Sequence, residues 1–412
     1  MTKHLLFILL LLNSAIAVAQ TVARFSIVLP PGSKTIDIPV NVDFDKQEML
    51  STGNMVLEEI VPGKRNIAIA HQLDRNGNML AFIINANSGE SKREYILKKA
   101  GPALPAIMNA DDKDGALTIR SGNRNLLRYH HHTVYPPLGI DTNFKRSGFI
   151  HPLWTPHGQE LTTIQPSDHY HHYGLWNAWT HTLFENDTVD FWNIKGRKGT
   201  VRFVRFKSIV NGPVYSEFEA IHEHVVFKKD GSEKVALDEL QSVRVYRPST
   251  GKDYYFVDIT SELRCGTESP LLLLTYRYGG LGWRATALWD KNNSELLTSE
   301  GKTRKDADAS KARWCIVQGK LNDDYGGAVL MSATTNYNHP EPLRVWDENA
   351  NNNRGDMFVN ISPTRDRDWL LEPGKTFTLK YRLVVFNGKF DAKMAESAWQ
   401  NFSSQVDRKI GK

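Results

Sequence analysis

The segment VYSEFEAIHEHVVF, residues 214 to 227, decides the fold class of this chain. Its apolar and charged residues alternate, which puts Glu217, Glu219 and Glu223 on one face, as the two-residue period of a β-strand requires. The simplest interpretation of these glutamates is a solvated strand face that carries an ionic ladder. The segment therefore predicts a long β-strand with one face in water.

Similar patterns extend on both sides of this segment, from about residue 107 to residue 390. Turns separate further alternating runs such as VRFVRFKSIV, ELQSVRVYRP and YYFVDITSEL. Because no break divides this stretch, we expect one large two-sheet β-sandwich over residues 107–390, and we expect it to be the catalytic domain. Helical periodicity is clear only in residues 391–412, which are predicted to be a helix and a tail. The residues that share the apolar helix face are Ala395, Ala398, Trp399 and Phe402.

The residues before 107 predict a second, smaller domain. Residues 20–100 contain short alternating runs divided by turns such as PPGSK, PGKRN and RNGN, which indicates a small immunoglobulin- or fibronectin-like β-sandwich. The sequence GPALPA, residues 101–106, is typical of a linker. The protein is thus expected to be all-β, with a small and a large sandwich and a C-terminal helix.

The first residues predict export. A charged start, the apolar run LLFILLLL and a small-residue exit are typical of a signal peptide over residues 1–19, so we expect a periplasmic or secreted protein. No later stretch reaches the roughly 20 apolar residues that a spanning helix needs. Although the net charge is +5, basic and acidic residues are interleaved, which argues against a nucleic-acid partner. Pairing of Cys265 with Cys315 and the oligomeric state stay open.

Histidines cluster in one part of the chain. Eight of the fourteen lie between His130 and His172, in YHHHTVYPP, FIHPLWTPHGQEL and DHYHHYGLW. Such segments, rich in proline, glycine and tryptophan, are typical of loops on a rigid β scaffold, where binding and catalytic groups concentrate. The cluster therefore predicts a functional site.

Imidazole exchanges protons near neutral pH, which suits acid/base catalysis as well as metal binding. If residues 168 to 172 are extended, His169 and His171 project to one face and Tyr170 and His172 to the other. Asp168 would hold the tautomer of one of these rings. The predicted catalytic residues are His151, Asp168, His169, His171 and His172.

A metal site is an alternative that this spacing leaves open. Two ligands from one strand would need a third, from His151, His157 or the run His130 to His132. The set that we consider for zinc, copper or iron is His169, His171 and His151, although no HExxH or paired CxxC signature occurs. A divalent metal is therefore an alternative, and no cofactor is expected to be required.

Tryptophans and arginines near these histidines indicate sugar binding. Indole rings stack on the apolar faces of sugars, and guanidinium groups match carboxylates and sulfates. A second polar cluster in residues 336–369 contains His339, Arg344 and Arg354, and a long irregular segment in a β domain favours an ordered rim of a site. The predicted substrate-binding residues are Arg146, Trp154, Trp176, Trp179, His339, Arg344 and Arg354.

The stretch RSGFIHPLWTPHGQELTTIQPSDHYHHYGLWNAW, residues 146 to 179, with DFW at residues 190 to 192, resembles a secreted bacterial family of unknown function often labelled "methane oxygenase PmoA". The resemblance extends over about residues 105 to 390. The large domain also resembles the galactose-mutarotase-like β-supersandwich, and LEPGKTFTLKYRLVVF, residues 371 to 386, is similar to the closing strands of aldose epimerases. These resemblances imply sugar chemistry and a place in polysaccharide degradation, without selecting a reaction.

Together these observations predict an exported carbohydrate-active enzyme that acts on an oligosaccharide or on uronate-containing polysaccharide fragments. Histidine-based elimination or dehydration is favoured over ordinary hydrolysis, because a glycosidase generally uses two carboxylates. The alternatives are a noncatalytic carbohydrate-binding protein and a histidine-ligated copper or zinc oxidoreductase. The particular glycan and bond stay open.

Overall fold

The computed structural model describes residues 20–29, 35–44, 54–74, 78–86, 91–99, 104–404 and 407–411. The predicted signal peptide, residues 1–19, lies outside these ranges, and so do residues 101–103 of the predicted linker. In the described part of the chain, no helix is both long and apolar enough to cross a membrane.

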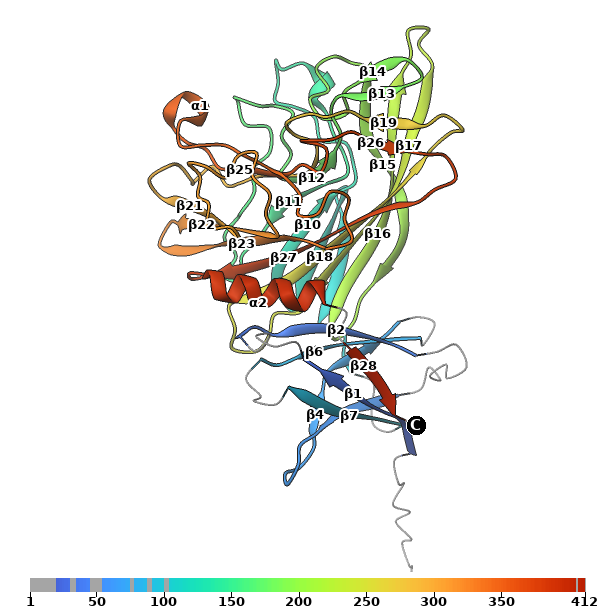
Figure 1. The fold of residues 1–412 in the computed structure, drawn as a ribbon, viewed down its shortest axis with the longest axis vertical. Helices are drawn as coiled ribbons and strands as arrows, with labels where there is room; N and C mark the ends of the chain where they lie inside the picture. The colour runs from blue at the N-terminus through green and yellow to red at the C-terminus, as the bar shows by residue number, and fades with distance from the viewer. Residues whose placement is uncertain are drawn as a thin grey trace, which may run out of the picture.

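Two antiparallel sheets of eight strands each form the body of the protein (Figure 1). The first large sheet has the order β24 (Leu343–Val345), β25 (Phe358–Ile361), β20 (Gly280–Arg284), β12 (Leu175–Ala178), β11 (Phe149–Leu153), β10 (Arg124–His130), β9 (Ala116–Ser121) and β8 (Met108–Lys113). The second large sheet has the order β15 (Gly199–Val210), β16 (Tyr215–Phe227), β17 (Glu233–Tyr246), β18 (Tyr254–Cys265), β27 (Phe377–Asn387), β23 (Asp324–Ser332), β22 (Trp314–Leu321) and β21 (Ser294–Thr298). The all-β prediction is therefore confirmed.

Strand β16 shows why these residues form a sandwich. Phe218 and Ala220 are fully buried in the core between the two large sheets. The glutamates that alternate with them face outward, where Glu217 pairs with Arg244 and Glu223 with Arg202. The predicted ionic face of this strand is thus confirmed.

The described residues before 100, coloured blue in Figure 1, form two smaller sheets at one end of the molecule, and the red C-terminal strand β28 joins one of them. One is the five-stranded sheet β28 (Asp407–Gly411), β1 (Gln20–Val28), β7 (Lys92–Lys99), β3 (Met55–Ile60) and β4 (Ile67–Ile69). The other is the three-stranded sheet β2 (Ile38–Asp43), β6 (Met79–Ile84) and β5 (His71–Leu73). Both contribute to one apolar core, which includes Phe25, Val40 and Phe82.

The C-terminal segment contains the expected helix and an additional strand. Helix α2 (Ala392–Ser403) begins after Asp391, whose side chain accepts a hydrogen bond from the backbone of Met394, as an N-cap residue does. The chain then returns to the small domain, where β28 pairs antiparallel with β1. The sequence pattern predicts only a tail at this position.

The small domain is held against the large one by specific polar contacts. The side-chain oxygen of Gln72 accepts hydrogen bonds from the backbone of Val214 and Tyr215, each 3.1 Å long. A Cβ atom on Gly212 would lie 2.2 Å from that oxygen, so only glycine allows this approach. Apolar residues of the small domain, including Ile36 and Ala81, share a core with strands of the second large sheet and with α2.

The described structure also contains several smaller features, among them the short 3-10 helix Thr142–Phe144. A four-stranded sheet contains β14 (Asp187–Val189), β13 (Thr182–Phe184), β19 (Leu271–Leu273) and β26 (Trp369–Leu371). The short turn α1 (Ala350–Asn353) contains asparagines with positive φ. Cys265 and Cys315 are both free, which answers the question that the sequence left open.

Candidate functional site

The histidines at residues 169, 171 and 172 lie in a series of tight turns. The backbone N–H of His169 donates to the carbonyl of Pro166, and that of His172 donates to the carbonyl of His169. The extended conformation that would separate the rings onto two faces is therefore wrong. Instead the three rings meet, with centroids 5.3 Å apart for His169 and His171 and 4.7 Å apart for each of the other two pairs.

These rings form one wall of a cavity of about 100 Å³ on the outer face of the first large sheet. Asn177 points between the two large sheets and donates to Glu239 of β17, so the adjacent Trp176 lies on the outer face of β12. Trp176 packs there against Trp192 and His172. The residues that line the cavity are His169, His171, His172, Trp192, Asn193, Arg277, Tyr278, Arg344, Trp346 and Phe358.

A glycine in strand β20 makes room for the floor of this cavity. A Cβ atom on Gly282 would lie 2.5 Å from Cη2 of Trp192 and 3.4 Å from Cη2 of Trp176. Glycine inside a strand often marks such a close approach. Trp192 and Phe358 are 1% and 2% exposed, so the floor is apolar and almost closed to water.

A chain of charges lies behind the histidine wall. Nδ1 of His169 donates to Oδ2 of Asp168 over 2.8 Å. Nη2 of Arg284 then bridges Asp168, at 3.0 Å, and Asp356, at 2.5 Å. The Arg284 guanidinium also lies over the ring of Trp346, 4.6 Å from its centroid, which favours a buried cation.

Burial and charge act on Asp168 in opposite directions. Burial alone would raise the pKa of Asp168, but the hydrogen bond from His169 and the positive charge of Arg284 outweigh it and lower this pKa. Asp168 is therefore an anion at neutral pH. A carboxylate must accept, so it holds the proton of His169 on Nδ1 and leaves Nε2 to face a ligand.

The other two histidines of the wall are held neutral. Burial lowers the pKa of His171 to about 3, and it lowers the pKa of His172 well below the ordinary value. His172 is 3% exposed, whereas the side chain of His169 is 35% exposed. His169 is thus both oriented by Asp168 and accessible to a substrate.

His151 does not line the cavity. Its Nδ1 is hydrogen-bonded to the hydroxyl of Thr162, and its carbonyl accepts a hydrogen bond from Nε2 of His130. Burial is the main reason that the pKa of His151 falls to about 4. We therefore assign His151 to the packing of the outer sheet face.

Arg146 and the three predicted tryptophans are covered or lie away from the cavity. Arg146 is 2% exposed and donates to the carbonyls of Phe191 and Trp192, so it positions that loop. Trp176 and Trp179 are 2% and 1% exposed, which leaves them no surface on which a sugar could stack. Trp154 forms an isolated bridge with Glu160 and does not line the cavity.

The residues from the second polar cluster divide between two places. Arg344 lines the cavity, and Arg354 lines a neighbouring hollow of about 260 Å³ together with Asp168 and Arg284. His339 stacks instead on Trp399 of helix α2, with centroids 6.1 Å apart, and is hydrogen-bonded to Ser332. Residues 346–356 thus form a rim, as predicted for part of this cluster, whereas His339 packs against the helix.

Several residues of the cavity wall were not predicted as site residues. Arg277 and Tyr278 of the wall, and Arg284 behind it, lie in TYRYGGLGWRATALW, residues 275–289, where the sequence pattern predicts no site residue. The glycines of this run, between aromatic and basic residues, were the available signal, because strand glycines mark close approach. Trp346 and Phe358 lie in the second polar cluster, residues 336–369, where the sequence predicts that these aromatic residues anchor the rim rather than line a site.

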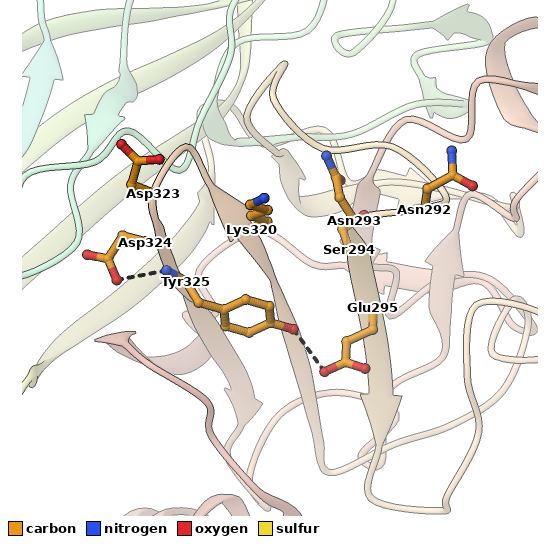
Figure 2. Close-up of a pocket in the computed structure, with 8 residues that line it drawn as sticks. All are labelled: Asn292, Asn293, Ser294, Glu295, Lys320, Asp323, Asp324 and Tyr325. Carbon is orange, nitrogen blue, oxygen red and sulfur yellow. Dashed lines mark hydrogen bonds between the residues drawn. The ribbon is translucent and has the colours of Figure 1, made fainter.

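A larger groove of about 640 Å³ lies along strands β21, β22 and β23 (Figure 2). Two of its three carboxylates have partners: Glu295 accepts from Tyr325 and Gln318, and Asp324 accepts from His157. No imidazole lines this groove. The smaller cavity is therefore the better candidate for acid/base chemistry.

A fully buried polar network lies between the two large sheets. Glu239 accepts hydrogen bonds from Asn177 and Ser261 and contacts His222 and His224. All of these side chains are nearly inaccessible to water, so we assign the network to the core. Among the residues that the structure describes, no three His, Cys, Asp or Glu side chains are grouped so that they could hold a metal ion.

The fold and cavity define an all-β protein with a histidine- and arginine-lined site on the outer face of a sandwich. Residues 116–400 match the family described as "Family of unknown function (DUF6807)", and since this is more than half of the chain, the protein belongs to that family. No curated protein matches the chain significantly. Its chemistry must therefore be argued from the cavity itself.

Proposed function

We propose that the protein is an exported carbohydrate-active enzyme that acts on oligosaccharides or uronate-containing polysaccharide fragments by histidine-based acid/base chemistry. The observation that carries the proposal is the accessible ring of His169, oriented by Asp168 in the wall of an aromatic cavity. The resemblance of the large domain to the galactose-mutarotase-like fold supports sugar as the ligand. This resemblance is a prediction from the sequence alone.

Elimination or dehydration fits this cavity better than ordinary hydrolysis. A glycosidase generally places two carboxyl groups about the scissile bond, and no carboxylate lines the cavity. His169 would accept a proton on Nε2 as general base. Tyr278, whose pKa burial raises to about 12, is a neutral phenol at neutral pH and would donate a proton to the leaving oxygen.

The aromatic side chains of the wall would hold the sugar. Trp346 is only half-buried, and its ring lies 4.8 Å from that of His169, centroid to centroid. A sugar ring on this indole would place its C–H and hydroxyl groups beside the imidazole. Trp346 thus replaces Trp176 and Trp179 as the proposed stacking surface.

The test is incubation with a panel of neutral and charged oligosaccharides, followed by mass spectrometry and ultraviolet absorbance. Elimination produces an unsaturated sugar without adding water, dehydration removes 18 mass units, and hydrolysis adds 18. We expect the His169→Gln variant to lose product formation by about 10²- to 10⁴-fold. His157→Gln is the matched control, because His157 lies on the surface between Asp324 and Asp253.

Two results would favour the alternatives. If sugars bind, no product forms and His169→Gln leaves affinity unchanged, the protein is a noncatalytic carbohydrate-binding protein. If the purified protein contains stoichiometric copper or zinc and turnover requires it, the oxidoreductase alternative replaces our proposal.

A further inference from the structure

The charges around the cavity are not balanced. Two guanidinium groups, those of Arg277 and Arg344, line it with three imidazoles and no carboxylate. Behind the histidine wall, Asp168 and Asp356 are matched by Arg284 and Arg354. The imbalance therefore lies on the side of Arg277 and Arg344.

Two arginines share one carboxylate on that side, and a third lies next to them in the chain fold. Arg344 and Arg365 both pair with Oδ2 of Asp308, at 3.0 and 2.9 Å. Nη1 of Arg365 also donates to the backbone carbonyl of Arg277, which brings the third arginine into the group. The guanidinium of Arg277 lies 5.6 Å from the ring centroid of Tyr278, and it forms no ion pair with any carboxylate of the described residues.

Arg277 is exposed on this wall, so its guanidinium is accessible to an anionic ligand. A guanidinium matches the planar oxygen pair of a carboxylate or sulfate. Asp190 accepts hydrogen bonds from the backbone of Trp192 and Asn193 and from the Asn193 side chain. Its oxygens are therefore bonded within the loop, and among the described residues it forms no ion pair with Arg277.

The size of the cavity indicates which part of a ligand enters it. About 100 Å³ is below the roughly 300–1,000 Å³ of a typical ligand pocket, so it takes one end of a larger molecule. His169, Arg344 and Trp346 also line an adjoining hollow of about 400 Å³ beside Asp347, Asn349 and Asn351. The rest of the ligand would continue into this hollow.

We infer that Arg277 and Arg344 form an anion-recognition site for the carboxylate or sulfate of a terminal sugar, whose neighbouring units lie in the hollow beside Trp346. This inference rests on the proposed function for its assignment of the ligand as a sugar. It adds the substrate class, an oligosaccharide with a charged terminal sugar, and it assigns recognition of that charge to Arg277.

The test compares oligosaccharides that end in glucuronate, in glucose 6-sulfate or in glucose but are otherwise identical. Binding to the full-length protein is measured by calorimetry at low and at moderate ionic strength. We expect both charged probes to bind at least about tenfold more tightly than the neutral one, and Arg277→Gln to remove about tenfold of that affinity. Arg264→Gln is the matched control, because it removes one exposed cation from the second large sheet.

The outcomes separate this inference from the proposed function. Equal affinity for charged and neutral ends, or no effect of Arg277→Gln, would overturn the anion site even if a product forms. Loss of the charge preference in Arg277→Gln would support the site even if no sugar is ever converted. A preference for glucuronate over glucose 6-sulfate identifies the anion as a carboxylate, and the reverse identifies it as a sulfate ester.

Discussion

The carboxylate of Asp168 lies 2.8 Å from Nδ1 of His169, the next residue in the chain. Neighbouring residues in a strand point to opposite faces, so this contact requires the turn that residues 166–172 form. The turn also brings His171 and His172 to the same wall. The backbone conformation of one short loop thus brings together His169, the proposed acid/base group, and the carboxylate that would orient it.

Replacement of Asp168 by asparagine should lower the rate of product formation by about 10- to 100-fold. Asparagine keeps the shape but no longer requires the proton on Nδ1, so a fraction of His169 would present the wrong tautomer to the substrate. The pH profile should shift as well, since the anion beside His169 is lost. An unchanged rate and profile, with Asp253→Asn as the surface control, would contradict the orienting role.

Stability should fall as the pH decreases from 7.5 to 5. Burial lowers the pKa of His130 and of His151 to about 4. In the unfolded chain these histidines have a pKa of about 6.5. Below that pH they bind protons in the unfolded chain but not in the folded one, so the free energy of unfolding decreases. We expect a loss of about 1–2 kcal/mol for each of these histidines by pH 5, measured as the free energy of unfolding in urea.

The variants His151→Gln and His157→Gln should change this pH dependence in opposite directions. Without His151 the folded protein has one fewer histidine with a lowered pKa, so the loss of stability on acidification becomes smaller. The hydrogen bond with Asp324 raises the pKa of His157, so His157 adds a little stability below pH 6.5 that is lost as the pH rises through its folded value. Its removal should make the acid loss slightly larger, and a change of the same sign in both variants would refute the assignment.

Gly282→Ala should disturb the cavity floor. The added methyl group would lie 2.5 Å from Trp192, and forced overpacking of this kind costs about 1–3 kcal/mol. We expect reduced sugar affinity and a changed near-ultraviolet circular dichroism spectrum. Gly196→Ala is the control, because a Cβ atom there has no neighbour within 4 Å, and equal behaviour of the two variants would show that Gly282 does not support Trp192.

The fold was largely predictable, because alternation along strands such as β16 reports directly which face is buried. The segment that holds His169, His171 and His172 was also found, since imidazoles and aromatic residues are dense there. The predicted local conformation was wrong, because the prediction assumed an extended strand where Pro166 and the following residues form turns.

Long-range contacts account for the other differences. Trp176 and Trp179 were predicted as a stacking surface, and nothing in their own segment shows that Trp192, Phe358 and Trp369 cover them. Likewise, strand β28 pairs with β1, which lies at the other end of the chain, so its own segment does not reveal its partner. Arg284 lies between Asp168 and Asp356, which are distant from it in sequence, so only the folded sheet reveals its role.

Arg284→Met should be the most destabilising of these substitutions. The side chain of Arg284 is 4% exposed and bonds two carboxylates, and the side chain of Asp356 is 5% exposed. Removal of one member of such a buried group leaves uncompensated charge and costs about 3–5 kcal/mol.

Because Asp168 and Asp356 would then repel each other, combining Arg284→Met with Asp168→Asn should recover part of the loss. Chemical denaturation of both single variants and the double variant measures this coupling, which we expect to be about 0.5–3 kcal/mol. Additive losses would show that Arg284 does not hold Asp168, and with it His169, in place.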